Sequence, residues 1–442
     1  MNSFVLPPPK PQISLFDLNS TSKALASALQ WRRRSQFFKF FPILRRKRDI
    51  IHATTALLQQ FEHDVVVVGA GIIGLSIARQ LLLESELSVA VVDAGLPCSG
   101  ATGAGQGYIW MAHRTPGSDT WELALRSKHL WEELAESVRR KGLDPLQVLG
   151  WKKTGSLLIG RTSKERAILE ERVMLLSHTG LRAEFLSANS LLSREPALEV
   201  GKEGCAAFFL DDCQIDAFKT VSFIEKGNKC FASGGRYAEF YNDPALCLVR
   251  SEINTVHDAI RTSKNILHFK KALVIAAGAW SGCLMQSLFV GTGIVPVPVK
   301  PRKLNHGLME VGYIIHQSAS SQPVENTRHL SSVSMTATID MNGNLVLGSS
   351  REFSGFSKEV DKQIVKSILE RASEFLPALN DLLLQLNENG KIKVGFRPYM
   401  PDGKPVIGPV LRLPKVFLAT GHEGSGLSLV CLLLTLSQIL PS

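Results

Sequence analysis

Residues 64–74 read DVVVVGAGIIG, and residues 89–93 read VAVVD. The first stretch predicts an apolar strand followed by a turn with the spacing GxGxxG, and the second predicts another strand that ends in an acid. In such a turn Gly69 permits a tight bend, Gly71 lets the backbone approach a pyrophosphate, and Gly74 lets the following helix pack closely on the strand. This order of strand, turn, helix, strand and acid predicts a dinucleotide-binding βαβ unit.

The predicted helix begins near Gly71, where its positive end would face the phosphates. Asp93 follows Gly74 by 19 residues, and its carboxylate is placed to accept hydrogen bonds from ribose hydroxyls. An acid at this position favours an unphosphorylated ribose. Residues 65–83 are apolar enough to suggest a membrane span, but Arg79, Gln80 and three glycines disfavour one. The remaining alternative is a buried helical hairpin.

The chain has 442 residues, is 45% hydrophobic and carries a net charge of +10. Most of that charge belongs to residues 1–50, which hold ten Lys and Arg against two Asp. A basic, Ser- and Pro-containing segment before the first strand predicts an organelle transit peptide, with the plastid (chloroplast) favoured over the mitochondrion. A nucleic-acid-binding arm is the alternative, but no basic patch interleaved with aromatic residues follows it, so no nucleic-acid partner is expected.

The seven cysteines are odd in number and widely spread, with no CxxC pair, which predicts reduced thiols. No His or acidic cluster has the spacing of a metal site, so no metal is expected. No transmembrane segment is expected either, and the oligomeric state is left open.

The rest of the chain predicts an α/β protein with a parallel sheet and a second, largely antiparallel sheet. Helices are expected over residues 120–141, 165–176 and 359–375, and strands over 154–160 and 271–280. Residues 294–350 look β-like, with Pro296 and Pro298 in one strand and hairpin turn residues at 340–344.

Two dense motifs close the chain. Residues 395–409 read GFRPYMPDGKPVIGP, and residues 416–427 read VFLATGHEGSGL. The second motif again predicts a strand, a glycine turn and the start of a helix, which directs backbone N–H groups at a ligand above the sheet.

With these motifs the sequence resembles the glycine oxidase, D-amino-acid oxidase and sarcosine oxidase family of FAD-dependent oxidoreductases, also called the DAO family. The resemblance covers residues 64–429 and includes the small-residue run SGATGAGQG at 99–107 and the strand ALVIAAGAWS at 272–281. It implies a Rossmann-like FAD-binding domain with a separate substrate domain. No cysteine occurs in residues 395–403, where one branch of the family attaches its flavin, so noncovalent FAD is implied.

The resemblance also implies which residues contact FAD. They come from the first glycine turn, the acid after the strand at 89–93, the small-residue run, the strand at 272–281 and the C-terminal turn: Gly69, Gly71, Ile72, Ile73, Gly74, Asp93, Ser99, Ala101, Thr102, Gly278, Gly424, Ser425, Gly426 and Leu427. For Gly278 the alternative is that it only permits close packing.

Arg397 is the residue that the resemblance assigns to the substrate carboxylate, and a guanidinium matches a carboxylate bidentately. The alternative for Arg397 is a salt bridge to an acid at a domain interface. His422 is the second candidate for a catalytic role, with a structural role in the turn as the alternative. A proton-relay role for His306 is disfavoured, and Tyr399 is a candidate for the cavity mouth.

The implied function is oxidation of a small amino acid or amine by hydride transfer from the α-carbon to flavin N5, giving an imine and, if oxygen is the acceptor, hydrogen peroxide. One alternative is a dehydrogenase that passes electrons to a quinone or carrier protein. The other is a catalytically weak flavoprotein with a variant C-terminus, because the leucine-rich tail from Cys431 departs from the family.

The predicted domains divide the chain into a leader, an FAD-binding part and a substrate part. The leader is 1–60, the FAD-binding domain is 61–150, 195–290 and 392–442, and the substrate domain is 151–194 and 291–391.

Overall fold

The computed structural model describes residues 58–249, 258–288, 300–304, 309–310, 332–342, 344–352, 356, 359–380, 392–411 and 413–430. Contacts divide the chain into residues 1–58 and 59–442, and all elements described below belong to the second unit. Residues 1–57 of the predicted transit peptide, the prolines at 296 and 298, His306 and the tail from Cys431 lie outside the described residues, so those predictions remain untested. Residues 59 and 60 of the predicted leader belong to the first strand.

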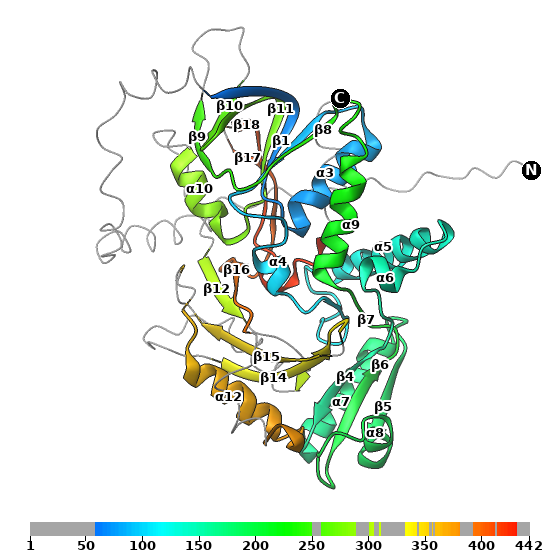
Figure 1. Ribbon diagram of the computed structural model, residues 1–442. Coiled ribbons are helices and arrows are strands. Elements are labelled where there is room, and N and C mark those ends of the chain that lie inside the picture. The colour runs from blue at the N-terminus through cyan, green and yellow to red at the C-terminus, as the bar shows by residue number, and fades with distance from the viewer. Residues whose placement is uncertain are drawn as a thin grey trace, which may run out of the picture. The chain divides into compact units, whose positions relative to one another are not determined.

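An eight-stranded sheet forms the first layer, and its centre is parallel as the sequence predicts (Figure 1). The order β17-β18-β11-β1-β2-β8 has parallel pairs from β18 to β8, with β17 antiparallel at one edge and β10 and β9 branching from β11. The strands are β1 Gln59–Val68, β2 Val89–Val92, β8 Tyr237–Phe240, β9 Ala245–Val249, β10 Ala259–Thr262, β11 Asn265–Ile275, β17 Val406–Val410 and β18 Leu413–Thr420.

Both faces of this sheet are covered, which explains why β1 reads as an unbroken valine run. Val65 and Val67 pack with helices α3 (Ile72–Glu84) and α9 (Ala217–Lys229), whereas Val66 and Val68 pack on the opposite face with α10 (Ser281–Leu288). Figure 1 shows α3 and α9 side by side on their face of the sheet. The carboxyl ends of β1, β2, β11 and β18 therefore lead into neighbouring loops.

A second sheet is antiparallel throughout, in the order β14-β15-β12-β16, and confirms the predicted second sheet. Asp340 accepts backbone hydrogen bonds from Asn342 and Asn344, so the predicted hairpin turn forms where it was expected. Helix α12 (Lys362–Ser373) contacts both hairpin strands. The strands are β12 Lys300–Leu304, β14 Ser332–Ile339, β15 Leu345–Glu352 and β16 Gly395–Tyr399.

A third sheet has the order β13-β4-β6-β5 and carries the helices α7 and α8. Its strands are β13 Met309–Glu310, β4 Ser156–Gly160, β5 Ala183–Ser187 and β6 Cys205–Phe209, and its helices are α7 Ser163–Ser177 and α8 Ala188–Arg194. The short strands β3 (Tyr108–Ile109) and β7 (Cys213–Gln214) pair separately. The remaining elements are α4 Ala101–Ala104, α5 Trp121–Arg140, α6 Pro145–Leu149, η3 Gly278–Trp280, η4 Pro377–Leu379 and η5 Glu423–Ser425.

Three details differ from expectation. The strand predicted over residues 271–280 is wrong at its end, because β11 stops at Ile275 and Gly278–Trp280 form the 3-10 helix η3. The turn after Thr420 leads into the short 3-10 helix η5 and further turns, not into an α-helix within the described residues. Strand β6 pairs with β4 and β5, although residues 195–290 were assigned to the FAD-binding part, and β16 pairs with β12, although residues 392–442 were assigned there too. The pairing of β12 with β16 joins strands far apart in the chain, and local patterns do not encode it. The domain division itself stays a prediction.

Candidate functional site

The first glycine turn is closed by close backbone packing. Gly69 has φ +119°, and a Cβ built on it would lie 2.7 Å from the carbonyl carbon of Ala276 on the neighbouring loop. A Cβ on Gly74 would lie 3.0 Å from the carbonyl carbon of Gly69. Gly71 is the N-cap of α3 and has no side chain of its own to cap it, so the turn brings glycine backbone to the positive end of a 13-residue helix.

Asp93 stands at the end of β2, next to this turn. One carboxylate oxygen accepts a hydrogen bond from the Ala70 amide at 2.6 Å, and the other accepts from the Gly95 amide at 2.7 Å. These bonds fix the carboxylate beside the glycine turn.

The small-residue run connects the glycine turn to the antiparallel sheet. The Thr102 hydroxyl accepts a hydrogen bond from the Ile72 amide at 3.2 Å. A Cβ on Gly395, the first residue of β16, would lie 3.3 Å from the Cα of Ala101. Ser99 precedes α4 on the same segment, and its amide donates to the Leu96 carbonyl. The segment therefore brings the start of β16, two residues before Arg397, close to the glycine turn.

The C-terminal turn is held by side chains from distant segments. Arg114 Nη2 donates to Ser425 Oγ at 2.9 Å and to Ser428 Oγ at 2.8 Å. Trp131 Nε1 of α5 donates to the Leu427 carbonyl at 2.8 Å. Thr420 Oγ1 donates to the carbonyl of Gly278, which joins the C-terminal turn to the loop that follows β11.

The segment that carries Arg114 is itself clamped by two buried charged side chains. Asp212 accepts hydrogen bonds from the amides of Met111 and Ala112 at 2.8 and 3.2 Å, and burial raises the pKa of its carboxyl to about 6. Arg172 of α7 donates to the carbonyls of Ala112 and Arg114 at 2.7 and 2.6 Å, and burial lowers its pKa to about 10.

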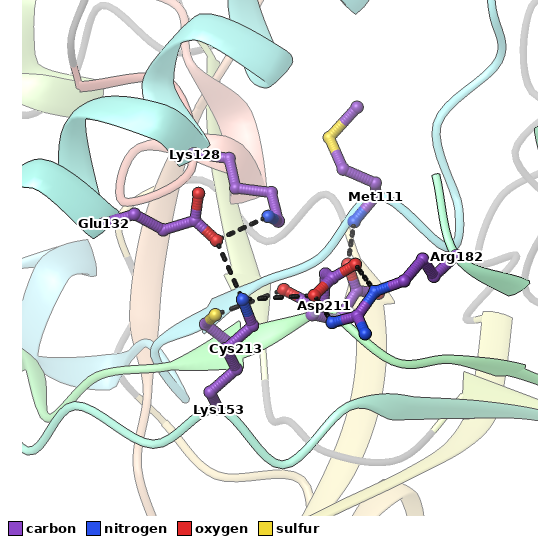
Figure 2. Close-up of polar contacts among 8 residues, drawn as sticks. Met111, Lys128, Glu132, Lys153, Arg182, Asp211 and Cys213 are labelled. Carbon is purple, nitrogen blue, oxygen red and sulfur yellow. Dashed lines mark hydrogen bonds and ion pairs between the residues drawn. The ribbon is translucent and has the colours of Figure 1, made fainter. Parts of the chain in front are cut away.

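Figure 2 shows the surroundings of this clamp, with the Met111 amide beside the corner that follows β6. A chain of ion pairs runs from Lys128 through Glu132 and Lys153 to Asp211 and Arg182, with 2.8 Å between Lys128 and Glu132 and 3.1 Å between Lys153 and Asp211. Hydrogen bonds from Arg182 and Lys153 keep the pKa of Asp211 well below its ordinary value. These pairs tie α5 to the corner from which Asp212 reaches the segment.

Arg397 lies in the middle of β16 and is 4% exposed. Its Nη1 atom lies 3.5 Å from a carboxylate oxygen of Glu423 in the C-terminal turn. The guanidinium also lies against Gly424, because a Cβ on this glycine would stand 2.6 Å from Cζ of Arg397. The two C-terminal motifs thus meet at the buried Arg397 side chain. Arg397 also forms an ion pair with an acid, Glu423, which is the kind of contact that the alternative interpretation expects.

His422 is 3% exposed, and burial lowers its pKa to about 4. Its Nε2 atom has no hydrogen-bond partner among the described residues, while its carbonyl accepts from the Ser425 amide at 2.8 Å. The imidazole is therefore neutral at physiological pH, with one buried ring nitrogen left for a ligand.

The residues around these turns offer space and polar groups of the kind that a bound dinucleotide needs. A Cβ on Gly100, Gly278 or Gly426 would meet no atom of the described residues within 4 Å, so these residues leave room beside the small-residue run, the end of β11 and the C-terminal turn. The backbone at the start of α3 suits phosphates, and the buried His422 nitrogen suits a flat polar ring.

Within the described part of the chain, no three His, Cys, Asp or Glu side chains are grouped so as to hold a metal ion. Nor is any described helix long and apolar enough to cross a membrane.

Comparison with known proteins gives the class to which this fold and site belong. The family model described as FAD dependent oxidoreductase, abbreviated DAO, matches residues 64–433, so the chain belongs to this family. The protein is therefore an FAD-dependent oxidoreductase, and FAD is its cofactor.

Individual relatives are distant but cover most of the chain. Hydrogen cyanide synthase subunit HcnC of Pseudomonas aeruginosa is 25% identical over 402 residues, which is 83% of this chain and 89% of the relative. Glycine oxidase of Geobacillus kaustophilus is 25% identical over 370 residues with the same coverage. The crystal structure of that glycine oxidase superposes with a TM-score of 0.66 at 22% identity, covering 86% of this chain and 96% of the other, and it supports the fold.

The sequence did not reveal several residues that hold this site. Arg114, Trp131, Arg172 and Asp212 act through contacts with segments far away in the chain. Glu423 lies within the motif at 416–427, and an acid next to a glycine in that turn was the one local sign of a functional side chain there.

Proposed function

We propose that the enzyme oxidises a small amino acid or amine whose carboxylate binds Arg397. The observation that carries this proposal is the position of Arg397, a buried guanidinium on β16 that lies against Gly424 of the turn expected to contact the flavin. A guanidinium in such surroundings is a strong carboxylate ligand because its N–H fork matches two oxygens and little water competes.

The predicted cofactor contacts divide into four groups. Gly69, Gly71, Ile72, Ile73 and Gly74 would hold the pyrophosphate at the start of α3, and Asp93 would hold the ribose. Ser99, Ala101 and Thr102 would line the segment that passes the flavin, and the remaining contacts come from Gly278, Gly424, Ser425, Gly426 and Leu427. The cofactor is proposed to be noncovalent, because no cysteine occurs in residues 395–403.

The chemistry that bound FAD supplies is to accept a hydride from the α-carbon of the substrate. The task of the chain is then to hold the substrate in one orientation and to keep water away. Arg397 fixes the carboxylate end. His422, neutral and buried, is suited to a hydrogen bond and not to delivering a proton, which agrees with a reaction that needs no dedicated side-chain base.

Oxygen is proposed as the electron acceptor, because a relative covering 83% of the chain is named glycine oxidase. A dehydrogenase with a quinone or carrier acceptor is the alternative, and a weakly active flavoprotein is the second. The test is steady-state oxidation of a panel of small amino and imino acids by the full chain, with hydrogen peroxide and dye reduction followed in parallel.

Peroxide formation with one amino acid, and a large rise in its KM in an Arg397→Ala variant with unchanged FAD content, are the expected results. Dye reduction without peroxide would favour the dehydrogenase. An unchanged KM in the Arg397→Ala variant would contradict the assignment of the carboxylate site.

A further inference from the structure

The carboxylate of Glu423 lies beside the cation that the proposed function assigns to the substrate. Glu423 Oε1 is 3.5 Å from Arg397 Nη1, with the two side chains 22% and 5% exposed. The pair is therefore screened from bulk water on the Arg397 side, where charges interact more strongly than at the surface.

Glu423 is held there by an unusual backbone conformation. Its φ is +46°, one of three positive values among the described residues other than glycine. Such conformations are disfavoured for glutamate and, where they persist, concentrate at ligand sites. The neighbouring amide of Ser425 donates to the His422 carbonyl, which closes the turn and helps keep Glu423 in this conformation.

Gly424 allows Arg397 to approach the turn that carries Glu423. The Arg397 guanidinium lies against this glycine, where even a methyl group would stand 2.6 Å from Cζ. The cation and the anion therefore lie next to one another in the folded chain.

This arrangement treats different ligands unequally. A simple carboxylate that binds Arg397 must approach the Glu423 carboxylate, and two like charges at short distance repel. A zwitterionic amino acid brings an ammonium group as well, which can donate a hydrogen bond to Glu423 while its carboxylate binds Arg397. Both charges of the protein pair are then matched by opposite charges of the ligand.

We infer that Glu423 is a specificity-determining residue that makes the Arg397 site select zwitterionic amino acids over simple carboxylates. This inference rests on the proposed function. It differs from the idea that Glu423 merely competes with the substrate for Arg397, because a competitor would weaken binding of every carboxylate.

The test compares acetate with glycine, two ligands that differ by the amino group. Binding of each ligand to the FAD-loaded full chain is followed under nitrogen by changes in the flavin absorption spectrum. If glycine reduces the flavin, its dissociation constant is taken from the saturation of the reduction rate with glycine concentration. The variants are Glu423→Gln and Glu423→Asp. A Glu184→Gln variant is the matched control, since Glu184 forms an ion pair with Arg194 at 3.2 Å on β5, outside the site.

Loss of one charge-assisted hydrogen bond or of one repulsive charge changes affinity by about tenfold. Glu423→Gln is therefore expected to bind acetate about tenfold more tightly and glycine about tenfold more weakly, with Glu423→Asp and Glu184→Gln keeping the wild-type preference. Thermal unfolding of each variant shows that it is folded.

Three results would overturn the inference: tighter binding of both ligands by Glu423→Gln, no change for either ligand, or a wild type that binds acetate as well as glycine. Acetate binding that survives an Arg397→Ala substitution would instead refute the proposed function, because the carboxylate would then bind elsewhere.

Discussion

Replacing Gly424 by alanine separates substrate binding from folding. The added methyl group would stand 2.6 Å from Cζ of Arg397, which is too close for any stable contact. The guanidinium is the far end of a flexible side chain, so it moves before the backbone does. Gly424 has no positive φ, and alanine therefore fits its backbone.

The magnitude follows from the interaction that is displaced. A hydrogen-bonded pair between a guanidinium and a carboxylate contributes about 1.5–3 kcal/mol, which corresponds to about 10- to 150-fold in affinity. We expect the KM for an amino acid to rise by this factor in Gly424→Ala. The unfolding free energy should change by less than about 1 kcal/mol, since alanine restricts the unfolded chain more than glycine does.

The assay is steady-state kinetics on the full chain together with urea unfolding and the flavin content after gel filtration. Gly234→Ala is the control, because its added Cβ would meet a single atom, 3.8 Å away, between α9 and β8. A Gly424→Ala variant with wild-type KM, or one that loses stability and flavin along with activity, would contradict the predicted displacement of Arg397.

Three other perturbations follow from the same contacts. Burial lowers the folded-state pKa of His422 from 6.5 to about 4, so the folded protein favours the neutral imidazole. The unfolding free energy should therefore fall by up to about 3 kcal/mol as the pH drops from 6.5 toward 4. Urea titrations of His422→Gln should show a smaller loss over the same pH range. Arg114→Met removes the guanidinium that donates to the hydroxyls of Ser425 and Ser428. The FAD dissociation constant, measured by flavin fluorescence, should rise by about tenfold, with Arg114→Lys intermediate. An unchanged dissociation constant would contradict a role of Arg114 in holding the turn. Gly69→Ala combines a φ of +119° with a clash against the backbone of Ala276 and should lower the unfolding free energy by about 2 kcal/mol or more, so a variant as stable as wild type would contradict the packing described.

The sequence allowed the parallel sheet and its turn to be predicted because their signals are local. A valine run, three glycines and a helix start lie within 20 residues, and each has a steric or electrostatic reason for its place. The hairpin at Asp340 was predictable for the same reason, since its side chain bonds residues two and four positions further on.

The support of the C-terminal turn was not predictable in this way. Arg114 bonds residues more than 300 positions away, and Trp131 reaches Leu427 across 296 positions. Nothing in the local pattern of either residue distinguishes it from other buried side chains. The proximity of Arg397 to Glu423 likewise depends on how β16 and the C-terminal turn pack together.

The most direct test of an FAD enzyme that binds its substrate through Arg397 is the visible absorption spectrum of the purified full chain under nitrogen, before and after addition of small amino and imino acids. We predict flavin bands that bleach with at least one amino acid in the wild type and stay unbleached by it in Arg397→Ala, with FAD bound in both proteins. A protein that neither carries nor takes up FAD, or a flavin that bleaches equally in both proteins, would contradict this prediction.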